Sequence, residues 1–148
     1  MIFTMDNADK YQDYIYAVGE VLGIENSLTE VRVDVKEKCD QDAGGFCYGD
    51  DDEIDIEVAT TVQGEPLEQE QIYRNIAHEM IHAEQMISGK LENVGLQLVQ
   101  TGDCQSLVNV CIWKGETHTN TKYDDQPWEI DAYAREEEVM KEAMLCLK

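Results

Sequence analysis

The chain has 148 residues, of which 32 are Asp or Glu and only 11 are Lys or Arg, so its formal net charge is −21. Contacts with nucleic acid and with anionic membranes both depend on Lys and Arg, so we expect neither partner. No apolar run approaches the roughly 20 residues that cross a bilayer, and the N-terminus lacks the pattern of a secretory signal. The length and a hydrophobic fraction of 43% suit a single domain over residues 1–148.

The five cysteines are odd in number and widely spaced, which argues against a disulfide framework. No two of them have the CxxC spacing of a zinc knuckle. We therefore expect reduced thiols and a cytoplasmic location. A Cys39–Cys47 bridge across a turn is the less favoured alternative.

The first half of the chain shows a helical pattern and then two alternating ones. Apolar residues at helical spacing predict a helix over residues 9–22, ended by Gly23. Apolar residues alternate with polar ones over residues 31–35 and again over 54–58, which predicts two strands. Residues 43–52 are rich in Gly and Asp, so we expect a turn there and a hairpin between the two strands.

The second half predicts a long helix, a strand pair and a last helix. The long helix covers residues 67–88, after Pro66. Residues 96–98 and 107–112 predict two strands around a turn at 101–103. Pro127 favours the start of a helix that runs to the C-terminus. The order of elements indicates an α+β fold with a small antiparallel or mixed sheet.

One motif in the long helix carries the chemistry, namely His78-Glu79-Met80-Ile81-His82, an HExxH sequence. Residues four apart lie on one face of a helix, so both imidazoles can reach one metal ion. Glu79 is offset by one position, where it can take a proton from a water molecule at the metal. The chain has only three histidines, so chance placement of two of them around a glutamate at this spacing is rare.

A catalytic zinc site has three protein ligands and an open position, so a third ligand must come from elsewhere. The candidates precede or begin the last helix and are Glu116, His118, Asp124, Asp125, Glu129 and Asp131. We favour Glu129, because the first turn of a helix holds a ligand more rigidly than the polar stretch around His118. The alternative is that Glu129 is an ordinary acidic residue at a helix N-terminus. Asp131 is a candidate for a supporting contact, and Tyr123 and His118 are candidates for stabilising an oxyanion.

Two short segments resemble the zincin metallopeptidases. The HExxH motif, followed about 45 residues later by Pro127-Trp128-Glu129-Ile130-Asp131-Ala132, is similar to small gluzincin-type and SprT-like members, including minimal ones encoded by bacteriophages. The resemblance implies a small sheet packed on the motif helix and on the C-terminal helix. It also implies zinc held by His78, His82 and Glu129, with Glu79 as the general base in peptide-bond hydrolysis.

The resemblance further implies an edge strand that holds an extended peptide, here residues 54–60. The partner would be a protein or peptide substrate, and a basic one, because a negative field attracts cations. A phage-encoded protein would act in the host cytoplasm. The chain departs from related groups in two ways: no third histidine closely follows His82, and no CxxC pair forms a zinc ribbon. The second departure and the net charge both argue against a DNA-associated role.

Two other functions suit the composition. The chain can be an acidic zinc-binding or peptide-binding protein without catalytic activity, but a purely structural zinc site has no need of Glu79 as a base. It can also be an acidic protein that engages basic partners, which would leave the HExxH motif accidental. We therefore expect a zinc metallopeptidase.

Overall fold

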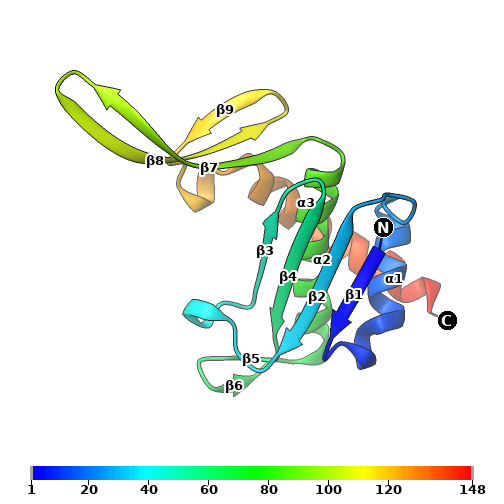
Figure 1. The fold of residues 1–148 in the computed structure, drawn as a ribbon. Coiled ribbons are helices and arrows are strands. Elements are labelled where there is room, and N and C mark those ends of the chain that lie inside the picture. Colours follow the sequence, from blue (N-terminus) through cyan, green and yellow to red (C-terminus); the bar gives the residue numbers. More distant parts are fainter. Residues whose placement is uncertain (1, 148) are drawn as a thin grey trace.

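The computed structural model describes residues 2–147, which form three α-helices and three small β-sheets (Figure 1). This confirms the α+β class. The helices are α1 (Gln12–Val21), α2 (Gln69–Ile87) and α3 (Pro127–Cys146). Short 3₁₀ helices lie at Asp9–Tyr11, Asp40–Asp42 and Tyr123–Asp125. The strands are β1 (Ile2–Asp6), β2 (Glu30–Lys36), β3 (Gly45–Gly49), β4 (Glu53–Ala59), β5 (Thr61–Val62), β6 (Glu65–Pro66), β7 (Leu91–Thr101), β8 (Cys104–Trp113) and β9 (Glu116–Thr119).

The largest sheet is mixed, with the order β1-β2-β4-β3. The predicted hairpin between residues 31–35 and 54–58 is wrong, because β2 and β4 run parallel, with Val33 opposite Ile56. Parallel neighbours need a crossover connection, which α1 supplies between β1 and β2. The predicted turn at 43–52 contains β3, and it is β3 that pairs antiparallel with β4.

The strand order also determines which strand forms the edge of the sheet nearest the HExxH helix, and this strand differs from the predicted one. The expectation that residues 54–60 form the edge strand is wrong, because β4 lies between β2 and β3. The edge strand is β3, and it packs against α2. A short Gly-rich strand is hard to recognise from the sequence, because glycine weakens strand propensity.

All three helices lie on one face of this sheet (Figure 1). Alternate residues of the central strands point into the core, including the fully buried Val33 and Val58. Ile76 and Met80 of α2 are completely buried in the same hydrophobic cluster. The apolar stripe of α2 therefore faces the sheet, and its opposite side is left to face α3.

The other predicted elements are confirmed, although β7 (Leu91–Thr101) extends well beyond the predicted residues 96–98 on both sides. Helix α2 ends just before Gly89, which has a φ of +82°, a left-handed conformation that glycine adopts without strain. Helix α3 begins at Pro127, and β7 and β8 form the expected hairpin. All five cysteines are free thiols. Among the described helices, none combines the length and apolar character needed to cross a membrane.

Candidate functional site

Three side chains from α2 and α3 converge beside the edge strand. His78 and His82 lie one turn apart on α2, and Glu129 lies in the first turn of α3. One potential ligand atom from each lies within 4.8 Å of the others. Nε2 of His78 is 3.0 Å from one carboxylate oxygen of Glu129, and Nε2 of His82 is 2.9 Å from the other. Ala132, on the next turn of α3, is fully buried.

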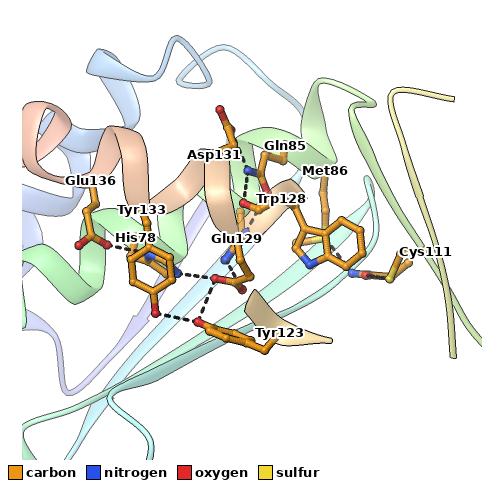
Figure 2. A network of polar contacts seen from close by, with 12 residues as sticks. His78, Gln85, Met86, Cys111, Tyr123, Trp128, Glu129, Asp131, Tyr133 and Glu136 are labelled. Carbon is orange, nitrogen blue, oxygen red and sulfur yellow. Dashed lines mark hydrogen bonds and ion pairs between the residues drawn. The ribbon is translucent and has the colours of Figure 1, made fainter. Parts of the chain in front are cut away.

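The second nitrogen of each imidazole is also engaged, as Figure 2 shows for His78. Nδ1 of His78 lies 2.7 Å from a carboxylate oxygen of Glu136 on α3. Nδ1 of His82 lies 2.8 Å from the amide oxygen of Gln85 on α2. These acceptors fix the orientation of both rings and direct the two Nε2 atoms toward Glu129.

Gln85 connects the His82 ring to α3. Its amide donates hydrogen bonds to the carbonyl oxygen of Trp128 and to Asp131, both at 2.9 Å (Figure 2). Asp131 also accepts a hydrogen bond from Arg135 at 2.8 Å. Asp131 therefore contacts the residue that orients His82, and Gln85 itself is completely buried.

Glu79 lies next to these side chains and is only 8% exposed. A Cβ atom at Gly45 of β3 would lie 3.1 Å from Cγ of Glu79, so a glycine at this position leaves room for the glutamate. Burial raises the pKa of Glu79 to about 7, although the charges of His82 and His78 oppose the shift. A carboxyl group with its pKa near neutrality can both accept and release a proton.

The charges of the cluster are strongly coupled. Burial alone lowers the pKa of His78, but its hydrogen bond to Glu129 and the surrounding carboxylates outweigh burial and raise that pKa to about 9. The pKa of His82 is raised against burial for a similar reason. Burial raises the pKa of Glu129, but the hydrogen bond with His78 and the close contact with His82 outweigh burial and lower that pKa to about 2. When no metal is bound, a proton on His78 therefore offsets the charge of Glu129.

A cavity lies on each side of the cluster. The larger has a volume of about 250 Å³ and mostly polar walls. It is lined by Ala43, Gly44, Gly45, Gln71, Asn75, His78, Glu79, Tyr123, Tyr133 and Glu136. The smaller, of about 70 Å³, is lined by Cys47, His82, Met86, Leu91, Asn93, Trp128 and Glu129. The edge strand β3 contributes a residue to each cavity and so passes both.

Of the other residues that the sequence predicted near the site, Tyr123 contacts Glu129, and His118 and the remaining ligand candidates lie outside the converging group. The hydroxyl group of Tyr123 donates to Glu129 at 3.0 Å and lies 2.8 Å from the hydroxyl of Tyr133 (Figure 2). His118 lies outside the converging group in the described part of the chain, and its ring packs edge-on against Trp128. The remaining candidates for a third ligand, Glu116, Asp124, Asp125 and Asp131, are likewise not in that group.

Sequence reasoning missed three residues that contact the histidines: Glu136, Gln85 and Tyr133, whose ring lies 4.6 Å from that of His78. Helical spacing is a signal that could have found them. Gln85 is three positions after His82, and Tyr133 and Glu136 are four and seven positions after Glu129. These spacings place them on the same helix faces as the residues that were predicted.

No protein-family model, curated protein or solved structure matches this chain. The resemblance to zincins therefore depends on its two sequence segments, and the structure adds the proximity of His78, His82 and Glu129.

Proposed function

We propose that this protein is a zinc-dependent peptidase, in which His78, His82 and Glu129 hold the metal and Glu79 is the general base. The observation that carries the proposal is the convergence of these three side chains within 4.8 Å. The HExxH motif alone supplies two of them, and the third comes from another helix. Convergence across 47 positions of sequence is not a consequence of local helical spacing.

The residues present fit a zinc ion. Two imidazole nitrogens and one carboxylate oxygen are a ligand set that binds catalytic zinc in proteins. Within the described residues, Nε2 of His82 is buried and has no well-aligned hydrogen bond, although Glu129 lies 2.9 Å away. A buried nitrogen in that situation would gain from a metal in place of a poorly directed contact. Glu136 and Gln85 at the outer nitrogens are the supporting contacts that metal-binding histidines usually have.

The chain's own groups then have distinct tasks. Bound zinc supplies Lewis acidity, which lowers the pKa of water and polarises a carbonyl group. Glu79 accepts a proton from the attacking water and delivers it to the departing amine. Tyr123 donates to Glu129 and orients that carboxylate. Asp131 supports His82 through Gln85.

The edge strand β3 provides a place for the substrate. Among the strands that the structure describes, β3 pairs with β4 alone, so an extended peptide can add to its other edge by strand pairing. Gly45 and Cys47 of β3 line the two cavities, which can receive side chains from either side of the scissile bond. Glu136 and Glu79 line the larger cavity, and this favours a basic side chain there.

The substrate preference can be tested with charged peptides. We expect the zinc-loaded protein to cleave basic peptides faster than acidic peptides of the same length at low ionic strength, because the chain carries a net charge of −21. The ratio of kcat/KM should shrink as salt is added, since the Debye length falls to about 10 Å at 0.1 M. Equal rates at low salt would contradict the preference.

The support of His78 by Glu136 gives a second prediction. We expect Glu136→Ala to weaken zinc affinity by roughly 10- to 100-fold, the usual cost of removing such a contact. The matched control is Glu137→Ala, which removes an exposed carboxylate paired with Lys141 on the same helix. Calorimetric zinc titration of both variants measures the effect. Equal affinities in the two variants would show that Glu136 does not support the site.

The direct test of the function is cleavage of an unfolded protein substrate by zinc-loaded protein. We expect cleavage that stops on addition of a chelator and returns with zinc. A folded protein that takes up no zinc would contradict the proposal. Stable zinc binding with no cleavage of any substrate would instead favour a zinc-binding protein without catalytic activity.

A further inference from the structure

The outer part of the β7–β8 hairpin, residues 96–109, projects away from the rest of the molecule (Figure 1). Strand β9 pairs with β8 over Val110–Trp113, so within residues 2–147 this outer hairpin has two strands and no third. An isolated two-stranded hairpin is only marginally stable in water. A two-stranded hairpin of this kind is stabilised when another protein surface packs against it.

One face of the outer hairpin carries three leucines, Leu96, Leu98 and Leu107, beside Gln100, Gln105 and Asn109, and we call it the leucine face. Leu98 lies directly opposite Leu107 in the strand register, and Leu96 is two residues from Leu98, so all three share one side of the sheet. Their exposed fractions are 68%, 62% and 65%. Single exposed leucines are common on protein surfaces, whereas a contiguous apolar patch is a feature of interaction surfaces.

The hairpin is also the least charged part of a strongly acidic chain. Residues 93–113 contain one charged side chain, Asp103 in the turn, between two uncharged runs of ten residues. Elsewhere in the sequence no uncharged run exceeds seven residues. Sheet edges in monomeric proteins usually carry charged residues or proline. Residues 96–101 of the β7 edge have neither.

We propose that the leucine face docks onto the leucine face of a second copy of this chain, forming a two-fold symmetric dimer. A basic protein would be expected to meet acidic side chains, and nucleic acid or an anionic membrane would be met by Lys and Arg. A neutral apolar surface instead allows two chains of charge −21 to meet without bringing carboxylates together. Because the same patch is used on both copies, the assembly closes at two.

The size of the surface predicts how strong the dimer is. Each outer strand is six residues long, or about 20 Å at the usual rise per residue. One face of such a hairpin is smaller than the roughly 800 Å² that each partner buries in a standard stable interface. The dimer is therefore reversible and concentration-dependent.

Sedimentation velocity over a range of concentrations tests the proposal. A reducing agent must be present, because Cys104 and Cys146 are exposed thiols that could form disulfides between chains. We expect a reversible monomer–dimer equilibrium in the wild-type protein. The double variant Leu98→Gln with Leu107→Gln should weaken association by at least about tenfold, because the dimer would lose four leucines. Its circular dichroism and its zinc content should be unchanged, since both side chains are exposed and distant in sequence from the zinc ligands.

The matched control replaces two leucines outside the hairpin that are at least as exposed, Leu28→Gln with Leu145→Gln. It should associate like the wild type. Hydrogen exchange at high concentration should show new protection confined to residues 96–109. The proposal is overturned by a wild-type monomer at every concentration, by equal weakening in the control, or by binding of the monomer to neutral lipid vesicles through this face. None of these results depends on whether the protein cleaves peptides.

Discussion

Glu79→Gln is expected to remove peptide hydrolysis while the protein keeps its fold and its zinc. Glutamine has nearly the shape of glutamate but cannot accept the proton from water, and the loss of a general base lowers the rate by roughly 10²- to 10⁴-fold. Glu79 is not one of the three converging side chains, so metal content should not change. The measurement is kcat/KM on a fluorogenic peptide, together with metal analysis of the same sample.

The matched control is Glu70→Gln, on the same helix. Glu70 is exposed and pairs with Arg74 one turn away, so its removal should leave both activity and zinc content unchanged. Survival of hydrolysis in Glu79→Gln would exclude Glu79 as the base. Loss of zinc together with hydrolysis would show that Glu79 helps to hold the metal.

His82→Ala is expected to remove high-affinity zinc binding. The wild-type protein should be stabilised by zinc, by about 2.7 kcal/mol when the free metal is a hundredfold above its Kd. The variant should show no such rise at the same zinc concentration. It should also be less stable than the wild type without zinc, because the carboxylate of Glu129, with its side chain only 13% exposed, loses one of its two imidazole partners. Thermal unfolding with and without zinc, and metal content by mass spectrometry, measure both effects.

His118→Ala is the control for this experiment, because it removes the third histidine of the chain from outside the converging group. Its zinc content and its zinc-dependent Tm shift should equal those of the wild type. A loss of zinc in His118→Ala would contradict the ligand set and would make His118 a ligand. Full zinc binding in His82→Ala would contradict the proposed site itself.

Much of the site could be predicted because it follows from helical geometry. Two histidines four residues apart must share a helix face, and Pro127 marks the start of the helix that carries Glu129. Gln85, three positions after His82, and Glu136, seven positions after Glu129, also lie at helical spacing from predicted residues. However, acidic and amide residues are frequent on exposed helix faces, so this spacing does not by itself show which of them contact the histidines. That is decided only when α2 and α3 pack together.

The sheet could be predicted only in part. Alternation identified β2 and β4, because their valines and isoleucines point into one core. It could not give their direction, since parallel and antiparallel strands share the same two-residue period. The decisive elements were β1 and the glycine-containing β3, which periodicity did not reveal.

The sequence by itself determined the helices, the alternating strands, the acidic surface and the pairing of two histidines with a glutamate on one turn of helix. These properties depend on residues close together in the chain. Only the tertiary structure decided which strand forms the edge of the sheet, and which carboxylates meet His78. The physical reason is that both depend on contacts between segments far apart in sequence, whose closure is driven by burial of the common core rather than by any local pattern. The glycine at position 45 illustrates this, because a Cβ atom there would crowd both the carbonyl oxygen of Glu57 on β4 and the side chain of Glu79 on α2, each at 3.1 Å.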